Sequence, residues 1–522
     1  MDRLRFMKSL VNNQTGERTI MTVLDYLDNT AERLPEKEAL IDDTESVSYR
    51  ELCKRSDSIA TALMRETKAE CRPVVVFIDR NAASVCTFMG IVKTRNFYVP
   101  IDIGQPAERI RTILGKIRPA LLISVHGNGP EGLGFEEIPR LEYDDAVLTP
   151  PDNESLRLRR TRMIDTDPLY AICTSGSTGT PKAVLISHRS VLDFIPVFTR
   201  TFSLTQNEIF GNQAPFDFDV SVKDLYSALY LGATIYIIPR VCFVMPKKLV
   251  EVLDDRKVTT IIWAVSALCI AAGVNAFKYR VPGNLRRIMF SGEVMPIKML
   301  NVWRKYYPDA MFVNLYGPTE ITCNCTYYIV DREFDVTEQL PLGIAFENEE
   351  VLVLNEKNVP VRTGETGEIC VKGTCLALGY YGDPERTAQA FVQNPLQSAY
   401  PDMIYRTGDL AILQENGEYV FAARKDFQIK HMGHRIELEE VEAHLGAADG
   451  VSRASCLFDE KRQKIVGCYT GEATKEEIID QMKEKLPKYM IPNIFLQLEE
   501  MPLTKNGKTD RRKLREEYDK LY

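Results

Sequence analysis

The stretch ICTSGSTGTPKAVLIS, residues 172–187, decides how the rest of this chain is interpreted. Gly176 and Gly179 allow backbone N–H groups to turn toward an anion, because no Cβ stands in the way. Thr174 and Ser175 are among the small hydroxyl residues that add donors, and Lys182 adds a positive charge. The pattern therefore predicts a loop that binds phosphate groups.

Two other interpretations of this stretch are weaker. Most glycine- and serine-rich segments are flexible surface loops, but here hydrophobic residues flank the loop on both sides, LYAIC before it and AVLIS after it. The P-loop motif of kinases and GTPases requires glycine, four residues and then Gly-Lys. Gly176, Gly179 and Lys182 do not have that spacing, which disfavours a P-loop protein.

Before about residue 420, buried apolar runs alternate with amphipathic segments. Residues 74–78 (VVVFI), 119–125 (PALLISV) and 258–263 predict buried strands, and residues 81–93 predict the helix that follows the first of them. Such an alternation is typical of parallel sheets that helices cover on both faces. The chain is therefore expected to be an α/β protein.

The pattern changes near residue 404. Residues 411–413 and 419–422, joined by Glu-Asn-Gly, predict a hairpin, and a smaller α+β unit follows. In that unit, Thr474 and Glu477 form a capping box that opens a helix. We predict a boundary near residue 424, with domains 1–424 and 425–522, in a chain of 522 residues that is too long for one simple core.

The composition excludes several classes of protein. A net charge of −8 does not indicate the positively charged surface that binds nucleic acid. The N-terminus lacks the apolar block of a signal peptide, and the most membrane-like run, residues 261–274, is too short to span a bilayer. The 12 cysteines follow no disulfide framework, which indicates reduced thiols and a cytoplasmic protein. A zinc site is not expected, and His431 and His434 are predicted to be surface or loop histidines.

The segment TSGSTGTPKAV resembles the phosphate-binding motif of the acyl-adenylate-forming superfamily, which includes acyl-CoA synthetases, adenylation domains of nonribosomal peptide synthetases and firefly luciferase. Ala183 and Ala423 stand where that superfamily usually has glycine. Other segments resemble its further motifs in the same order: 47–52 (VSYREL), 97–102 (FYVPID), 314–320 (NLYGPTE), 405–410 (YRTGDL), 486–492 (LPKYMIP) and 506–511 (NGKTDR). The resemblance implies a large N-terminal domain of parallel-type sheets with helices and a small barrel-like β part, followed by a small mobile α+β lid domain.

The resemblance also implies ATP and Mg²⁺. Tyr316 would offer an aromatic face to the purine, Asp409 and Arg424 would bind the ribose, and Thr319 and Glu320 would face the α-phosphate and the metal. The full expected ATP site comprises Thr174, Ser175, Gly176, Ser177, Thr178, Gly179, Lys182, Asn314, Leu315, Tyr316, Gly317, Pro318, Thr319, Asp409, Arg424 and Lys508.

Lys508 matches the superfamily's adenylation lysine, which bridges the substrate carboxylate and the α-phosphate. A cation is needed there because attack of a carboxylate on a phosphate brings two anions together. Lys508, Thr319 and Glu320 are the expected catalytic residues, and Glu320 is the expected metal ligand.

Asp219 matches the aspartate that binds the α-ammonium group in amino-acid-activating members. The expected substrate pocket comprises Asp219, Val220, Lys223, Trp263, Met289, Ser291, Leu315, Cys323, Asn324 and Lys508. Trp263 and Met289 would fill volume and favour a small side chain. Lys223 would either pair with an acidic substrate side chain or snorkel out of the pocket, and snorkelling is the prediction.

Three segments resemble stand-alone D-alanine–carrier protein ligases most: SGEVMP, FDVSVKDLY and DFQIKHMGHRIELEEVE. Those ligases tend to have cysteine where this chain has Ser291 and an apolar residue where it has Lys223. The resemblance implies that an amino acid with a small side chain is activated as aminoacyl-AMP and transferred to the phosphopantetheine thiol of a separate carrier protein. D-alanine is one candidate substrate.

Asp426 falls at the hinge position of the superfamily, and Gly433 falls where the thiol approaches. No carrier or condensation domain follows residue 522, so the acceptor is expected to be a separate molecule. We expect a monomer with no nucleic-acid partner and no membrane insertion. The alternatives are an acyl-CoA ligase for a non-amino acid and a catalytically inactive binding protein.

Overall fold

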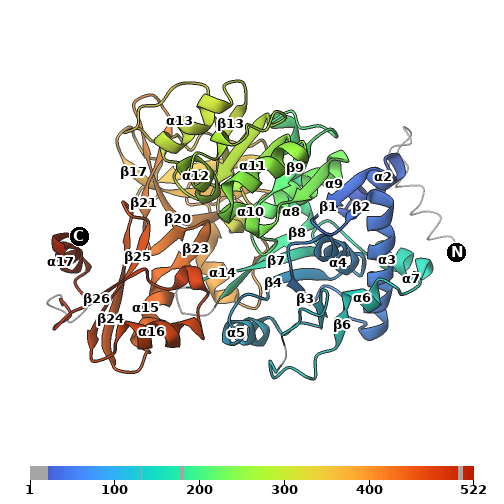
Figure 1. The fold of residues 1–522 in the computed structure, drawn as a ribbon, viewed down its shortest axis with the longest axis horizontal. Coiled ribbons are helices and arrows are strands. Elements are labelled where there is room, and N and C mark those ends of the chain that lie inside the picture. The colour runs from blue at the N-terminus through green and yellow to red at the C-terminus, as the bar shows by residue number, and fades with distance from the viewer. Residues whose placement is uncertain (1–20, 131, 177–180, 504–508, 522) are drawn as a thin grey trace.

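The computed structural model describes residues 21–521 except 131, 177–180 and 504–508 (Figure 1). It has a mixed α/β architecture, with a large N-terminal part built on three sheets and a small C-terminal part. The expected fold class is therefore confirmed. The boundary at residues 424/425 stays a prediction.

The first large sheet contains the predicted phosphate loop. Its seven strands are, in order, β18 (Gly379–Tyr380), β8 (Lys182–Ser187), β7 (Pro168–Thr174), β4 (Phe97–Asp102), β3 (Pro73–Ile78), β5 (Leu121–Ser124) and β6 (Arg140–Glu142). Strands β7, β4, β3, β5 and β6 are parallel, whereas β7 and β8 form an antiparallel pair. The pair ends at Thr174 opposite Lys182, so the loop between the two strands begins and ends at the same end of the sheet.

The second large sheet has nine strands. They are, in order, β15 (Ile344–Ala345), β14 (Thr326–Ile329), β13 (Met311–Tyr316), β12 (Arg287–Ser291), β11 (Thr260–Ala264), β9 (Ile209–Asn212), β10 (Thr234–Ile237), β1 (Glu38–Ile41) and β2 (Ser46–Ser48). The central strands from β13 to β1 are parallel.

One hydrophobic core joins the facing surfaces of these two sheets, with helices between them. Alternate residues of β3 point to opposite cores: Val74 and Val76 to this shared core, Val75 and Phe77 to a core with α5 (Ala107–Ile117). This is the burial on both faces that the apolar run VVVFI predicts. The helices that contribute to the shared core are α2 (Leu24–Arg33), α3 (Tyr49–Glu66), α4 (Ala82–Lys93), α8 (His188–Thr201) and α9 (Val220–Leu231).

The outer face of the nine-stranded sheet packs on a separate core. Its helices are α10 (Arg240–Val244), α11 (Pro246–Asp255), α12 (Val265–Gly273) and α13 (Ile297–Tyr306), with the short η1 (Ala276–Lys278). The apolar run 261–274 is thus strand β11 followed by α12, as its composition predicts. Among the described residues, no helix is long and apolar enough to cross a membrane.

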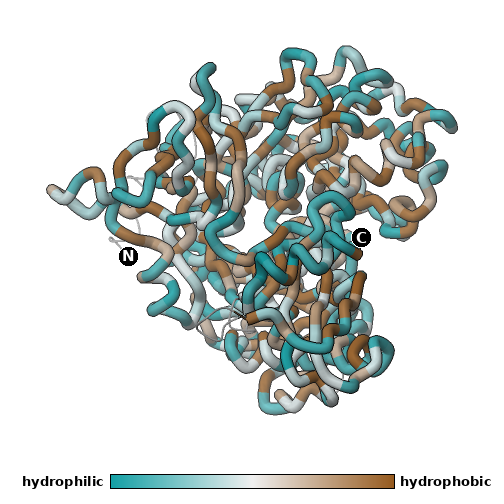
Figure 2. The backbone as a smooth tube through the Cα atoms, turned by 90° about the vertical axis from the view of Figure 1, so that its left-hand side faces the viewer, coloured by the Kyte–Doolittle hydropathy of each residue, from teal (hydrophilic) through white to brown (hydrophobic). Residues whose placement is uncertain are grey.

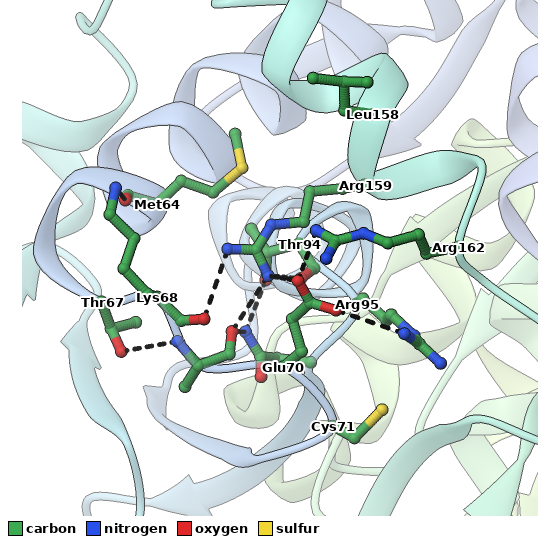
Figure 3. Close-up of polar contacts among 12 residues, drawn as sticks. Met64, Thr67, Lys68, Glu70, Cys71, Thr94, Arg95, Leu158, Arg159 and Arg162 are labelled. Carbon is green, nitrogen blue, oxygen red and sulfur yellow. Dashed lines mark hydrogen bonds and ion pairs between the residues drawn. The ribbon is translucent and has the colours of Figure 1, made fainter.

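Figure 3 shows a polar cluster that fixes α7 (Asn153–Arg160) to the first large sheet. The Glu70 carboxylate is contacted by Arg95 at 3.3 Å, Arg159 at 2.6 Å and Arg162 at 2.5 Å. Three guanidinium groups on one carboxylate anchor the segment between strands β6 and β7 of this sheet, which also contains α6 (Tyr143–Ala146).

The third sheet is antiparallel and connects to the C-terminal part. It contains β16 (Glu349–Leu354), β17 (Thr366–Gly373), β20 (Met403–Leu413) and β19 (Phe391–Gln393), with β21 (Tyr419–Arg424) paired to β20; α14 (Pro384–Ala390) precedes β19. The predicted hairpin is the β20–β21 pair, in which Ile412 lies opposite Val420.

The C-terminal part begins with the hairpin of β22 (Gln428–His431) and β23 (His434–Glu437), followed by α15 (Leu438–Gly446). The remaining elements are β24 (Val451–Asp459), β25 (Lys464–Gly471), α16 (Lys475–Lys483), η3 (Lys488–Met490), β26 (Ile494–Gln497) and α17 (Arg511–Leu521). The predicted capping box is present at α16, where Thr474 and Glu477 bond reciprocally. The mostly hydrophilic α17 lies at the outer edge of this part (Figures 1 and 2).

Candidate active site

A pocket opens where the carboxyl ends of both large sheets meet the β22–β23 hairpin. Strand β7 contributes Thr174, strand β12 ends in it at Ser291, and the hairpin contributes Gly433 and Arg435. Carboxyl ends of parallel strands are where open α/β sheets bind ligands. Of the predicted site residues, the lining includes Thr174, Ser175, Asp219, Val220, Ser291, Gly317, Pro318, Thr319, Cys323, Asp409, Arg424 and Gly433.

The predicted phosphate loop is held at its first turn by the C-terminal part. The Ser175 hydroxyl donates to the backbone carbonyl of Arg435 at 2.8 Å and accepts from the backbone N–H of Glu437 at 3.2 Å. Thr174 Oγ1 is buried and has no hydrogen-bond partner within the described part of the chain. Ser177, Thr178 and Gly179 lie outside the described residues, and Gly176 follows Ser175 directly.

Lys182, at the start of β8, is buried against Glu320 of η2 (Thr319–Ile321). Its Nζ lies 3.2 Å from Glu320 Oε1 and 5.2 Å from the centre of the Tyr380 ring. Burial, reinforced by the nearby Arg435 charge, lowers the pKa of Lys182 to about 8 although Glu320 opposes the shift. Negative charge added near this lysine would favour its protonated form and raise its pKa.

The Glu320 carboxylate is fully buried and already compensated. Arg435 Nη1 lies 2.7 Å from Oε2, and the Tyr380 hydroxyl donates to Oε1 at 2.8 Å. Burial opposes ionisation, but Arg435, Lys182 and Tyr380 together hold the pKa of Glu320 well below its usual range. In this arrangement Arg435 contacts one oxygen of the carboxylate that the sequence predicts to bind a metal.

Asp409 and Arg424 face each other across the β20–β21 pair. Arg424 donates to Asp409 Oδ1, and the Tyr316 hydroxyl donates to Asp409 Oδ2 at 2.7 Å. Arg424 is also held by both carboxylate oxygens of Asp426, at 2.6 and 2.8 Å. The predicted ribose pair and the predicted hinge residue are thus one connected network.

Strand β13 places the predicted purine residues at the same end of the pocket. The Lys430 ammonium lies 5.5 Å from the centre of the Tyr316 ring, the ring that the sequence predicts to contact a purine. Asn314 points to the other side of the strand from Leu315, and its amide donates to the Pro341 carbonyl at 2.9 Å. Gly317 must be glycine, because a Cβ there would stand 2.5 Å from Asn324 Cα.

Asp219 precedes α9 and makes no capping hydrogen bond with its side chain. Burial raises the pKa of Asp219, while the Thr319 hydroxyl and the Lys223 charge act in the opposite direction. The Cys323 thiol donates to the Asp219 carbonyl at 2.9 Å. The Asp219 side chain is half-buried and belongs to the pocket lining.

The prediction that Trp263 lines the pocket is wrong. Trp263 pairs with Phe290 on one face of the sheet, whereas Ile262 pairs with Met289 on the opposite face, and Ser291 and Leu315 share that face. The Trp263 indole packs on Phe243 and Trp303 in the outer core and donates to the Gly211 carbonyl at 2.7 Å. Ile262, its neighbour in β11, instead lies on the face that carries Met289 and Ser291.

The prediction that Lys223 snorkels out of the pocket is also wrong. Its side chain has 0% exposure, and Nζ donates to Asn324 Oδ1 at 2.5 Å. Residue 223 lies in the first turn of α9, whose sides are packed in the shared core, so no path leads its ammonium to solvent.

The β22–β23 hairpin enters the pocket through its turn. The Gly433 N–H donates to Glu293 Oε1 at 2.7 Å, and the His434 ring stacks on Tyr489 at 3.5 Å and meets Phe218 edge-on at 4.6 Å. Burial lowers the pKa of His434 to about 3, so this histidine is a neutral part of the pocket wall rather than a surface residue. A buried ion pair between Arg109 and Glu440, at 2.5 Å, joins the two parts beside it.

Lys508 lies outside the described residues. Helix α17, which follows it, is held on the far side of the C-terminal part by Arg511, which donates to the Cys456 carbonyl at 2.7 Å, and by Tyr518, which donates to Asp459 at 2.7 Å.

Sequence reasoning missed Arg435, Lys430 and Tyr380. The sequence did contain one signal for two of them: Lys430 and Arg435 lie on either side of Gly433, which was already predicted to be at the site.

Comparisons with known proteins agree with this geometry. The model of the AMP-binding enzyme family matches residues 27–381, and that of the AMP-binding enzyme C-terminal domain matches residues 440–508. D-alanine–D-alanyl carrier protein ligase of Bacillus cytotoxicus is 31% identical over 510 residues, covering 95% of this chain and 99% of that protein. The ligase of the same name from Bacillus licheniformis is 31% identical over 517 residues, covering 95% and 99%.

Solved structures share the fold. IdnL1 is 29% identical with a TM-score of 0.81 over 93% of this chain and 100% of that chain. An artificially fused adenylation–PCP di-domain, NpsA-ThdA from Klebsiella oxytoca, has a TM-score of 0.78 at 22% identity over 91% and 94%. At that identity the second likeness concerns the fold alone.

Proposed function

Since this chain belongs to the AMP-binding enzyme family and its full-length relatives are ligases, we propose that it uses ATP to activate the carboxylate of an amino acid and then transfers the aminoacyl group to the phosphopantetheine thiol of a separate carrier protein. The full-length relatives are carrier protein ligases, which supports ATP use and a carrier protein partner.

The observation that carries the proposal is the distribution of charge around one pocket. Hydroxyl groups of the phosphate loop, the Asp409 carboxylate beside Tyr316, and Asp219 all line it. An anion, a ribose and an ammonium group are the three partners that these side chains suit. Adenylation of an amino acid brings all three together.

The donor set fits ATP. The unpartnered Thr174 hydroxyl and the buried Lys182 suit phosphate oxygens, with Ser175 to Gly179 completing the loop and Lys508 as the adenylation lysine. Asp409 would accept from ribose hydroxyls, and the β13 segment with Asn314, Leu315, Tyr316, Gly317 and Pro318 would lie beside the purine.

Mg²⁺ would be held by Glu320, with Thr319 beside it. Among the described residues, no three His, Cys, Asp or Glu side chains are placed to bind a metal together, which suits Mg²⁺ because it takes few protein ligands and completes its shell with water and phosphate. When bound, the ion would neutralise charge that develops on the phosphates. Arg435 would have to leave Glu320 first.

In the first step, a substrate carboxylate oxygen attacks the α-phosphorus, a new P–O bond forms, and pyrophosphate leaves. Asp219 holds the ammonium group, and Lys508 stabilises the charge that gathers between the two anions. In the second step, the carrier sulfur attacks the acyl carbon, the bond from that carbon to AMP breaks, and the thiol proton is released to solvent.

The present arrangement suits the second step. Gly433 and Arg435 stand at the pocket, and α17, on the C-terminal side of Lys508, lies on the far side of the C-terminal part. We expect this part to turn about Asp426 between the two steps. The relatives make D-alanine the first substrate to test. The enzyme is expected to be a cytoplasmic monomer, which gel filtration and fractionation check.

ATP–pyrophosphate exchange with a panel of amino acids and of short and aromatic acids tests the proposal. Exchange is expected with amino acids only, and Asp219→Ala should reduce kcat/KM at least 100-fold, because the buried ammonium then has no counter-ion. Asp335→Ala, on an exposed loop, is the matched control. Exchange supported by acids that lack an amino group would instead indicate an acyl-CoA ligase, and ATP binding without any exchange would indicate an inactive protein.

A further inference from the structure

Lys223 is a buried cation with an incomplete set of partners. An ammonium group has three donors, yet among the described residues the one acceptor that Nζ reaches is Asn324 Oδ1. No carboxylate of the described chain stands within ion-pair distance of Nζ. Burial lowers the pKa of Lys223, because a site removed from water disfavours the charged form of the ammonium group.

The two nearest carboxylates differ in where they face. Asp224 accepts from the Asn212 amide at 2.9 Å, beside Arg80, and burial raises the pKa of Asp224 to about 7. Asp224 is thus already bonded to Asn212, although its charge and that of Lys223 also act on each other. Asp219 faces the pocket, and its charge and that of Lys223 act on each other across one helical turn.

The Lys223–Asn324 hydrogen bond joins two residues whose near neighbours in the chain line the pocket. Val220 and Cys323 line the pocket, Val220 is three residues before Lys223 on α9, and Cys323 is adjacent to Asn324. The lysine side chain has a flexible four-carbon stem, so its ammonium can turn toward a ligand group that enters between these two residues.

The positions of Asp219 and Lys223 limit the ligand. Residues four apart on a helix lie on the same face, with Cβ atoms about 5–6 Å apart. A ligand that carries an ammonium group and a carboxylate close together, such as an amino acid with a short acidic side chain, can therefore contact both residues. Ile262 and Met289 are fully buried on the sheet face that also carries Ser291 of the pocket lining.

From this juxtaposition we infer that the substrate is a short acidic amino acid, with its α-ammonium on Asp219 and its side-chain carboxylate on Lys223. This inference rests on the proposed function. With such a ligand every buried charge has a partner of opposite sign. A neutral side chain would leave the Lys223 charge uncompensated beside the bound ammonium, which is unfavourable in a site removed from water.

The test is ATP–pyrophosphate exchange by the full-length protein with both enantiomers of aspartate, glutamate, asparagine and alanine. We expect kcat/KM for aspartate or glutamate to exceed that for asparagine and alanine by at least about 100-fold, mostly through KM. In Lys223→Met, the acidic substrate should lose at least about 100-fold while the preference turns to neutral amino acids. Lys247→Met, an exposed lysine on α11, should behave as wild type.

A second measurement does not depend on a variant that folds. Aspartate or glutamate, added with ATP to the wild-type protein, should raise the melting temperature more than alanine does. Wild-type exchange with alanine but not with acidic amino acids, unchanged in Lys223→Met, would overturn this inference and leave the proposed function intact. Absence of exchange with every amino acid would overturn the proposed function itself.

Discussion

Lys182 titrates close to neutral pH because burial lowers its pKa to about 8. A bound triphosphate would raise that pKa again, since negative charge favours the protonated form. ATP binding above pH 8 should therefore take up a proton, and the affinity should fall by up to about tenfold for each pH unit. Calorimetric titration of ATP between about pH 7 and 9.5 measures this. Lys182→Arg, whose charge does not titrate there, should show a flat profile, and an equally steep fall in both proteins would contradict the assignment.

Trp263 and Ile262 show that the sequence did not predict which face of the sheet each side chain of this strand takes. Their neighbourhood was predicted correctly as a buried strand, but a one-residue shift in a strand exchanges the two faces of the sheet. In an apolar run with no polar alternation, the sequence contains no signal for which face each residue takes. Asp219, Asp409 and Arg424 were placed at the pocket because each lies in a motif with polar residues at fixed positions.

This assignment of faces makes a prediction about selectivity. Trp263→Phe removes the donor to the buried Gly211 carbonyl and should cost about 1–3 kcal/mol of folding stability, with the order of preferred substrates unchanged. Ile262→Ala should instead admit larger side chains, because it opens the face that carries Met289 and Ser291. Thermal melting and a substrate-panel exchange assay separate the two effects; a changed preference in Trp263→Phe would contradict this placement.

Among the elements, the β22–β23 hairpin is the one that brings the C-terminal part into the pocket. Its turn requires glycine: Gly433 has φ of +80°, and a Cβ there would stand 3.1 Å from Ala264 Cβ. Gly433→Ala should add about 1–2 kcal/mol of backbone strain and push the hairpin off strand β11. We expect thioester formation to fall more than tenfold, with a smaller effect on pyrophosphate exchange.

Gly417 provides the matched control for that substitution. Its φ of +84° imposes the same backbone strain, but a Cβ there would meet nothing within 4 Å. Gly417→Ala should therefore lower the melting temperature without slowing transfer to the carrier protein. If both variants slow transfer equally, strain rather than the contact with Ala264 is responsible.

Local signals predicted the individual elements well, because the capping box of α16 and the β20–β21 hairpin are encoded within a few residues. The contact of Ser175 with Arg435 spans 260 residues of sequence, and no local pattern encodes it. The same holds for the partners of Glu320: the carboxylate was identified, but its ion pair with Arg435 depends on how the two parts of the chain are placed.

At the scale of the whole molecule, the Arg109–Glu440 ion pair is a buried link between the two parts. Removing one partner of such a pair costs about 3–5 kcal/mol, because the other charge is left buried without compensation. Glu440→Ala should therefore disfavour the present arrangement and slow thioester formation more strongly than pyrophosphate exchange. The two half-reactions, measured separately, check this. The double variant Arg109→Met, Glu440→Leu should recover transfer, and failure to recover would mean that the pair does more than join the two parts.

The Ser175 hydroxyl belongs to the phosphate loop but hydrogen-bonds to the backbone of Arg435 and Glu437 in strand β23. The group that would bind nucleotide is occupied by the chain's own backbone whenever the hairpin is seated. If the carrier protein binds best to that seated state, nucleotide and carrier must weaken each other's binding. Linkage is reciprocal: the factor by which saturating carrier raises the Kd for ATP must equal the factor by which ATP raises the Kd for the carrier. ATP and the carrier protein would then disfavour each other's binding to the enzyme, and the two would bind one after the other in the catalytic cycle.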